Sequence, residues 1–232
     1  KQDPESDKVV LSAATDNNAA VQLAGRDFDW MGQHDKLSVT VGDNHFDDLS
    51  CALAGNHQLD NYAQAVAAAC QLRSQGVAIP DSAIRKAGRS VVWPGRLEWL
   101  GDSRKLLLDV SHNRAGIACL ADYLAEQNVS RVHLVTGLSG ERDPAEVLMP
   151  LVKYAAAVYA VPVSFGQSIP TKQVVTWAEQ QRLPVSEHAV ATEGLAVALK
   201  EAKASELVVV CGSLYLAAEL RQNFLSGEGS AR

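Results

Sequence analysis

The chain of 232 residues lacks several patterns that would indicate a function directly. Its four cysteines form no CxxC pair and its six histidines form no HExxH pattern, so neither a zinc site nor a disulfide framework is indicated. The phosphate-binding pattern GxxxxGK[ST] and the dinucleotide-binding pattern GxGxxG are missing as well. We therefore expect no metal site, free and mostly buried thiols, and a reducing compartment.

Excess positive charge and long apolar runs are also missing. The formal net charge is -6 and the sequence pI is about 5.5, which argues against nonspecific binding to nucleic acid or acidic membranes. No apolar run could span a bilayer, and the first eight residues do not resemble a signal peptide. We expect a cytoplasmic protein that binds neither membrane nor nucleic acid, and a monomer because no exposed apolar stripe stands out.

From about Leu97 onward, strand patterns alternate with helix patterns. Apolar runs predict strands, and apolar residues at i, i+3 and i+4 predict helices between them, one of them capped by Asp143. The expected strands are 106–110, 131–138, 157–163, 185–190 and 206–213, and the expected helices are 114–127, 143–155, 169–181, 192–202 and 214–225. This order predicts an α/β fold with a doubly wound, mostly parallel Rossmann-like sheet, which binds ligands at the carboxyl ends of its strands.

The first part of the chain has a different pattern. We expect strands at 9–13 and 20–25, a hairpin within 36–55 and an Ala-rich helix at 56–76. A further helix is expected at 79–91. Because these elements form no self-contained pattern, we expect residues 1–93 to be the partial remainder of a larger α/β domain, and residues 94–232 to be a complete second domain.

Asp109 follows an expected strand in the segment DVSHN, and His112 lies three residues later. A carboxylate at a strand end can accept hydrogen bonds from vicinal hydroxyls, as acidic residues do with ribose. Alternatively, Asp109 or Ser111 caps the helix that follows. His112 supports the first interpretation less strongly than Asp109 does.

Ser213 follows another expected strand, in the segment VVVCGSLY. Its hydroxyl and the backbone amides at a helix N-terminus suit a carboxylate or a phosphate, although Ser213 could also be a plain N-cap. The backbone amides of the loop 137–140 could also hold an anion, although a simple strand-to-helix turn is the better interpretation of this loop on its own. A hydrolase triad of Ser213, His112 and Asp109 is a distant possibility, since G-x-S-x-G is missing.

Two further polar residues lie near expected turns. Arg96 follows the rigid pair Pro94–Gly95, from which a guanidinium could clamp a phosphate, although a purely structural turn fits equally well. Asn61 lies in the first turn of the Ala-rich helix, where it could face a ligand. The structural alternative there is capping by Asn56 or Asp60.

Five motifs occur in a fixed order along the chain: AGNHQLDNYAQAVAAA, WPGRLEW, LLLDVSHN, VTGLSGERDP and VVVCGSLYLAAEL. The succession resembles the folylpolyglutamate synthase / dihydrofolate synthase family of the Mur ligase superfamily, whose pattern includes G-x-H-Q-x-x-N-A, P-G-R, D-V-A-H-N-P and G-S-L-Y. The resemblance covers nearly the whole chain. It implies that residues 1–93 belong to the central ATP-binding domain and residues 94–232 to the C-terminal, glutamate-binding domain.

The resemblance also implies an activity. Such enzymes are ATP-dependent ligases that join L-glutamate to dihydropteroate or folate. ATP phosphorylates the carboxylate, the glutamate amine attacks the acyl phosphate, and phosphate leaves. The implied ligands are ATP, L-glutamate, a folate or dihydropteroate, and Mg²⁺, with the metal ligands expected mainly in a preceding portion of the family's sequence.

Five positions in these motifs correspond to functional residues of the family. The resemblance implies that Asn61 meets the adenine, Arg96 contacts the nucleotide phosphates and Asp109 holds the ribose hydroxyls. It places His112 close to the nucleotide or the reacting centre, as the catalytic candidate. Ser213 is implied to bind the carboxylate of the incoming glutamate.

The chain departs from the family pattern in several places. Arg114 replaces the Pro after His-Asn, Tyr62 replaces the last Ala of the helix-start motif, and the segment 161–170 lacks a basic residue that the family often has there. The P-loop of the family is absent from these residues, so we expect a C-terminal fragment that is inactive alone. The alternative is a non-catalytic nucleotide- or partner-binding module that kept the fold.

Overall fold

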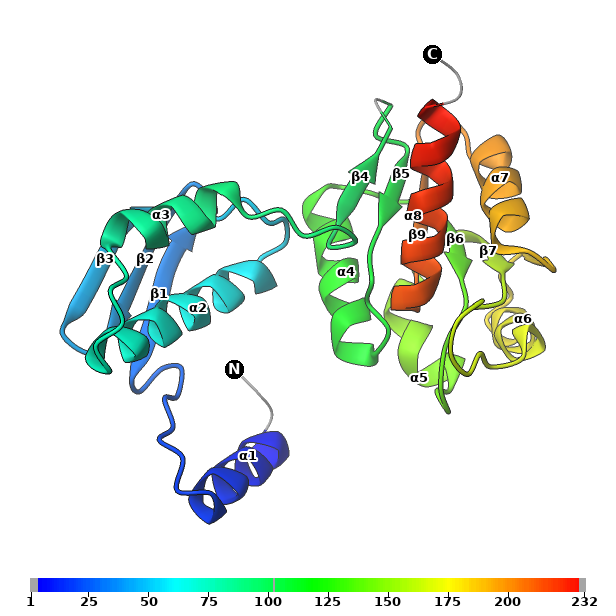
Figure 1. Cartoon of the computed structure of the whole chain (residues 1–232). Coiled ribbons are helices and arrows are strands. Elements are labelled where there is room, and N and C mark those ends of the chain that lie inside the picture. The colour runs from blue at the N-terminus through cyan, green and yellow to red at the C-terminus, as the bar shows by residue number, and fades with distance from the viewer. Residues whose placement is uncertain (1–3, 102, 230–232) are drawn as a thin grey trace. The chain divides into compact units, whose positions relative to one another are not determined.

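The chain forms two compact units, which meet in sequence between Val92 and Trp93. The computed structural model describes residues 4–101 and 103–229 (Figure 1). Each unit has its own hydrophobic core and is described separately below. No helix in the described ranges combines the length and the apolarity that crossing a bilayer requires.

The first unit contains a three-stranded antiparallel sheet in the order β1-β2-β3. The strands are β1 (Phe28–Gln33), β2 (Lys36–Val41) and β3 (Asn44–Leu49). The expected hairpin is confirmed as β2 and β3, and its turn uses Gly42 at a φ of 52°, which favours glycine. The sequence did not predict β1, because it is short and only its first residue, Phe28, is fully buried.

Two helices cover one face of this sheet, as Figure 1 shows. They are α2 (His57–Ser74) and α3 (Asp81–Ser90), and both confirm the helices expected there. The core forms because alternate residues of β2 and β3 point toward the apolar stripe of α2. Its main members are Leu37, Val39, Val41, Phe46, Leu49, Leu59, Ala63, Val66, Ala67 and Ile84.

The two strands expected before Asp27 are wrong. The segment 9–13 lies inside a helix, α1 (Pro4–Asp16), which satisfies its own backbone hydrogen bonds where a strand would need a neighbour. The segment 20–25 forms no strand. It leads into a tight turn in which the Asp27 carboxylate accepts the Leu23 N–H at 2.7 Å.

The second unit contains a six-stranded sheet in the order β4-β5-β9-β6-β7-β8. All neighbours are parallel except β4, which pairs antiparallel with β5. The strands are β4 (Glu98–Leu100), β5 (Leu106–Leu108), β6 (Val132–Thr136), β7 (Ala155–Ala160), β8 (Val185–Glu187) and β9 (Leu207–Cys211). The expected parallel α/β fold is confirmed, and β4 is an additional edge strand that the short segment LEWL did not reveal.

Both faces of the central strands are covered. One face of the sheet shares a core with α7 and α8, and its residues include Leu108, Val210 and Tyr159. The alternate residues Leu107 and Val209 belong to the opposite face and are equally buried. Burial on both sides explains why these strands are continuously apolar in sequence. The helices around them are α4 (Arg114–Glu126), α5 (Pro144–Leu148), α6 (Thr171–Gln180), α7 (Ala191–Glu201) and α8 (Leu214–Gly229) (Figure 1).

One of these helices is shorter than expected. The Asp143 carboxylate accepts the Ala145 N–H at 2.9 Å, so the predicted N-cap of α5 is confirmed. The helix ends at Leu148 and continues as the 3₁₀ turn η1 (Met149–Leu151). Pro150 accounts for the difference, because proline has no N–H to continue the hydrogen bonds of an α-helix.

Candidate functional site

The segments DVSHN and CGS lie side by side at the carboxyl ends of β5 and β9. The Asp109 N–H donates to the Val210 carbonyl at 3.0 Å, and the Gly212 N–H donates to the Ser111 carbonyl at 2.8 Å. The loop after β6 joins them, because Ser139 contacts Ser213. Four of the five candidate residues, Arg96, Asp109, His112 and Ser213, therefore belong to segments that meet at one edge of the sheet.

Asp109 is buried, with 5% of its surface exposed, and it binds backbone on both sides. One carboxylate oxygen accepts the Leu97 N–H at 2.9 Å and the other accepts the Ser111 N–H at 2.9 Å. The capping alternative is wrong, because Asn113 caps α4 by accepting the Gly116 N–H at 2.8 Å. In this structure Asp109 ties the turn that precedes β4 to the end of β5.

The turn that carries Arg96 is held from both sides. The Gly95 carbonyl accepts the Val110 N–H at 2.7 Å, and the Gly95 N–H donates to the Glu98 carboxylate at 2.7 Å. Gly95 has a φ of 78°, and a Cβ there would lie 2.5 Å from a Val110 methyl group, so the position requires glycine. The Arg96 side chain is exposed, and no described residue accepts a hydrogen bond from its guanidinium.

A shallow groove opens beside this turn. It has a volume of about 580 Å³ and runs between Pro94–Gly95, the end of β5 and α8. Its wall is largely apolar, and its charged member, Arg221, donates to Glu98 at 2.9 Å. Partial burial raises the pKa of Glu98, but hydrogen bonds from Arg221 and the Gly95 N–H outweigh it and lower the pKa below its ordinary value.

Ser213 begins α8 and is paired with a second serine. Its Oγ lies 3.0 Å from the Oγ of Ser139, and it accepts the Tyr215 N–H at 3.2 Å, as an N-cap does. Because the two hydroxyls share one hydrogen bond, one hydroxyl proton of the pair is left to donate elsewhere. The sequence analysis did not single out Ser139, although its place between Gly137 and Gly140 after a strand was a usable signal.

His112 is exposed at the start of α4. Its Nδ1 lies 3.0 Å from the Val110 carbonyl, so this nitrogen carries a proton and donates it. In the neutral ring, Nε2 is then the acceptor. Among the described residues, no hydrogen bond joins His112, Asp109 and Ser213 to one another, so the triad alternative is wrong for this geometry.

Asn61 belongs to the first unit and is described there by itself. It is exposed, and its Nδ2 donates to the Gln58 side chain at 3.0 Å. Asp60 does not cap the helix, because its carboxylate accepts the Trp30 indole N–H at 2.8 Å. Asn56 occupies the N-cap position of α2 without a capping side-chain hydrogen bond. Neither Asn56 nor Asp60 therefore caps α2 through a side-chain hydrogen bond, and the capping alternative is wrong.

The described residues contain no cluster of the side chains that usually bind metal ions. No group of three or more His, Cys, Asp and Glu residues among them could hold a metal ion.

The comparisons with known proteins agree with this architecture. A family model described as the Mur ligase glutamate ligase domain matches residues 95–214, just over half of the chain. A probable bifunctional folylpolyglutamate synthase/dihydropteroate synthase of Haloferax volcanii is 32% identical over 90% of this chain and 24% of its own length.

Two solved structures have the same fold. The Mycobacterium tuberculosis folylpolyglutamate synthase complexed with ADP has a TM-score of 0.86 at 22% identity, over 97% of this chain and 53% of that one. The bifunctional folylpolyglutamate synthase/dihydrofolate synthase of Yersinia pestis, complexed with AMPPNP and a Mn ion, has a TM-score of 0.77 at 21% identity, over 93% and 50%.

The chain spans half or less of the length of the curated relatives it matches. The matched residues contain the DVSHN segment and end immediately after Ser213. The matched range also contains the complete set of parallel strands. This chain therefore belongs to the Mur ligase family, through its glutamate ligase domain.

Proposed function

We propose that this chain is the nucleotide- and glutamate-binding part of an ATP-dependent ligase that adds L-glutamate to dihydropteroate, to folate, or to both. The observation that carries the proposal is the meeting of an exposed arginine, a serine pair and an exposed histidine at one edge of a sheet of the glutamate ligase family. An anionic nucleotide and an anionic amino acid both require such donors. The relatives and solved structures named above are folylpolyglutamate synthases.

Three residues would each contribute to nucleotide binding. Arg96 presents from a rigid turn a guanidinium with no acceptor among the described residues, which suits the phosphates. Asp109 would accept a ribose hydroxyl with a remaining lone pair, while its hydrogen bonds to Leu97 and Ser111 keep the Arg96 turn in place. Asn61 would meet the adenine with the amide atoms that its bond to Gln58 leaves free.

Glutamate would be recognised at the serine pair. The proton that Ser139 and Ser213 do not share would be donated to a glutamate carboxylate. Arg142, on the same loop as Ser139, donates to the Ser139 carbonyl and is partly exposed. It supplies a positive charge close to the pair, whereas the segment 161–170 supplies none.

The reaction would proceed through an acyl phosphate. The γ-phosphoryl group of ATP passes to the substrate carboxylate, the glutamate amine attacks the carbonyl carbon, and inorganic phosphate leaves. His112 would lie near the reacting centre, where its Nε2 can accept a proton from the attacking amine. Mg²⁺ would neutralise charge on the transferred phosphoryl group, with ligands mainly from the portion of the family's sequence that precedes these residues.

The decisive test is an assay of ATP-dependent incorporation of labelled L-glutamate into dihydropteroate and into reduced folate. It compares this chain with the complete product of the gene that encodes it. We expect incorporation by a product that contains a P-loop and none by this chain alone. Turnover by the chain alone would contradict the inactivity that we infer, and no turnover by a P-loop-containing product would favour a non-catalytic binding module.

A second test separates nucleotide binding from catalysis. ADP is titrated calorimetrically into the complete product and into its Arg96→Ala variant, with Arg104→Ala as a control that removes an equal charge before β5. We expect the Arg96 variant to bind ADP at least about tenfold more weakly, the loss of one charged hydrogen bond, and the control to bind it normally. Equal affinity of all three proteins would refute the role of Arg96.

A further inference from the structure

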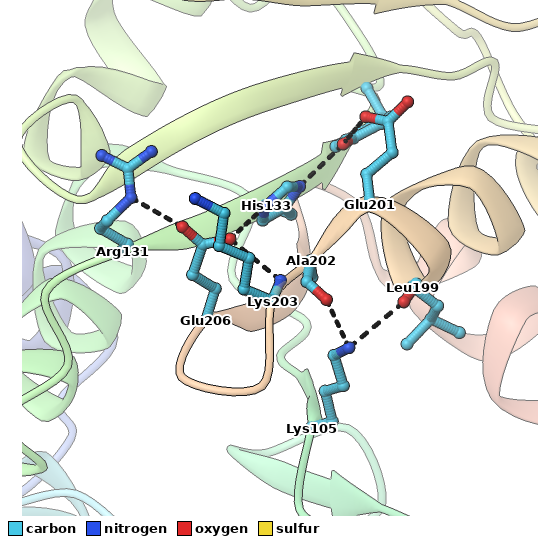
Figure 2. Close-up of polar contacts among 9 residues, drawn as sticks. Lys105, Arg131, His133, Leu199, Glu201, Ala202, Lys203 and Glu206 are labelled. Atoms are coloured by element: carbon cyan, nitrogen blue, oxygen red, sulfur yellow. Dashed lines mark hydrogen bonds and ion pairs between the residues drawn. The ribbon is translucent and has the colours of Figure 1, made fainter.

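A line of ionisable side chains that includes Arg131, Glu206, His133 and Glu201 lies at the amino ends of β6 and β9 (Figure 2). His133 of β6 lies between the Glu206 carboxylate, 3.1 Å from its Nε2, and the Tyr159 hydroxyl, 2.7 Å from its Nδ1. The same hydroxyl lies 2.7 Å from the Glu201 carboxylate at the end of α7. Glu206, His133 and Tyr159 are buried, with 4%, 6% and 1% of their surfaces exposed.

These three short contacts require more protons than the groups ordinarily carry at neutral pH. Each contact needs one hydrogen between its two heavy atoms. A neutral imidazole supplies one and a phenol supplies one, whereas two carboxylates supply none. One contact would then bring two acceptors together at 2.7 to 3.1 Å without a hydrogen, which is unfavourable in a buried site.

The extra proton resides on the imidazole and not on Glu201, because Glu201 is exposed to solvent and a carboxylate is a weaker base than an imidazole. The Lys203 backbone N–H, followed by Arg131 and His133, lowers the pKa of Glu206 to about 2, so Glu206 stays ionised. Burial, followed by the bond to Glu201, raises the pKa of Tyr159, so the phenol keeps its proton and donates it to Glu201. His133 must then donate from both ring nitrogens.

We propose that the folded second unit contains a buried proton-binding site at His133, which is held there as an imidazolium between Tyr159 and Glu206. Two carboxylates, one adjacent and one beyond the phenol, compensate the charge, as burial of a cation requires. Arg131 donates to the other oxygen of Glu206 at 2.8 Å and leaves Oε2 to His133. The site takes a proton as its ligand and is independent of the proposed ligase activity.

The other ionisable groups around the site have partners of their own. His188 stacks on Tyr159 at 6.1 Å, accepts or donates at Ser186, and lies 4.0 Å from Glu193. Lys105, at the start of β5, donates to the carbonyls of Leu199 and Ala202 at the end of α7. Figure 2 shows that this ammonium points to those carbonyls. It therefore does not supply the missing hydrogen.

The bound proton links stability to pH in a definite direction. Because the folded state binds one proton more than the unfolded state, the free energy of unfolding falls as pH rises. Below about pH 6.5 the unfolded chain protonates its histidine as well, so the contribution is complete there and is lost at higher pH. Glu206 acts in the opposite direction, since its contribution is lost as pH falls from about 4.3 toward 2.

A single conservative substitution can remove the need for the proton. In Glu201→Gln, the side-chain amide can donate to the Tyr159 hydroxyl, which then donates to His133 Nδ1. All three contacts are satisfied with a neutral imidazole. Glu201 is exposed and ends its helix, so the variant keeps the buried core. Glu193→Gln, on the same helix, is the matched control because its carboxylate faces His188 and not the site.

The test is a long-range proton–nitrogen correlation spectrum of the ¹⁵N-labelled chain at about pH 8, above the ordinary histidine pKa of about 6.5. We expect His133 to carry protons on both ring nitrogens in the wild type and in Glu193→Gln, and on Nε2 alone in Glu201→Gln. One ring proton in the wild type would overturn the proposal. So would two ring protons in Glu201→Gln, because the charge would then not depend on the Glu201 carboxylate.

Urea unfolding gives an independent readout. Between about pH 6.5 and 8 we expect wild-type stability to fall with pH more steeply than that of Glu201→Gln, by the difference of one bound proton. Equal slopes would overturn the proposal. Neither measurement uses nucleotide, glutamate or folate, so failure here leaves the proposed ligase function untouched.

Discussion

The two ends of the six-stranded sheet use their polar residues in opposite ways. At the amino ends of β6 and β9, His133 and Glu206 bond to each other and to groups of the protein around them. At the carboxyl ends of the same strands, Ser139 and Ser213 share one hydrogen bond, so one of their two hydroxyl protons is available to a ligand. Arg96 and His112, beside them, are exposed.

The difference shows how a parallel α/β sheet separates stability from binding. Polar groups that satisfy one another in a buried place stabilise the fold and leave no hydrogen-bonding groups available to a nucleotide or an amino acid. Groups that bind backbone on one side only, as the serine pair and His112 do, remain available. Substitutions of the polar side chains at the two ends should therefore differ in how much they change the free energy of unfolding.

The largest expected effect comes from a glycine on which the geometry of the carboxyl end depends. Gly212 has a φ of 105°, and a Cβ there would lie 2.6 Å from Thr136 Oγ1 and 2.7 Å from the Gly137 carbonyl. We expect Gly212→Ala to lower the free energy of unfolding by about 3 kcal/mol, the sum of backbone strain and overpacking. Urea unfolding followed by circular dichroism measures this loss.

Gly166→Ala is the matched control for this change. Gly166 also has a positive φ, 78°, but its Cβ would only touch the Tyr215 ring at 3.5 Å. Backbone strain alone should cost about 1 to 2 kcal/mol. Equal losses at the two glycines would show that the loops after β6 and β9 are not packed as closely as the structure has them.

The amino end should respond to the loss of a single hydroxyl. Tyr159→Phe keeps the ring and removes both hydrogen bonds of the Tyr159 oxygen, which leaves His133 Nδ1 without its partner. We expect a loss of about 2 kcal/mol at neutral pH. Thermal unfolding of this variant is compared with that of Tyr154→Phe, whose hydroxyl has no hydrogen bond among the described residues. A loss no larger than the control's would mean that the buried line of contacts adds no stability.

Much of this architecture could be predicted from the sequence, and the reasons are physical. The central strands β5, β6 and β9 are buried on both faces, so each is a mostly apolar run that a scan of the sequence detects. In contrast, β1 lies at a sheet edge with five of its six residues partly or fully exposed, and α1 packs few apolar side chains. Elements without a buried face leave no periodic signal.

The candidate site was predictable in position but not in hydrogen bonding. A carboxylate after a buried strand fixes Asp109 at the carboxyl edge, yet its two oxygens bind amides that are 12 and 2 residues away. The first of these contacts depends on the turn before β4, which lies outside the local segment around Asp109. Likewise, the contact of Ser139 with Ser213 spans 74 residues, and no local pattern encodes it.

A smaller effect is expected at the helix that follows Asp109. Asn113→Ala removes the side-chain oxygen that accepts the Gly116 N–H and should cost about 1 kcal/mol. Asn113→Asp keeps the acceptor and should restore most of the loss. Calorimetric melting of the three proteins tests this. If the alanine variant melts like the wild type, Asp109 or Ser111 must take over as the cap, which would revive the alternative rejected above.

The smallest effect on stability is expected at Arg96, and it tests the comparison most directly. Its guanidinium is exposed and has no hydrogen-bond acceptor among the described residues, so Arg96→Ala should change the free energy of unfolding by less than about 0.5 kcal/mol. Arg131→Ala, which removes a cation from the Glu206 end, should cost more, because Glu206 is buried and loses one of its donors. Urea unfolding of both variants measures the contrast. If the Arg96 variant is the less stable of the two, the Arg96 side chain must itself stabilise the fold. Its guanidinium would then not be available to bind a phosphate at this turn.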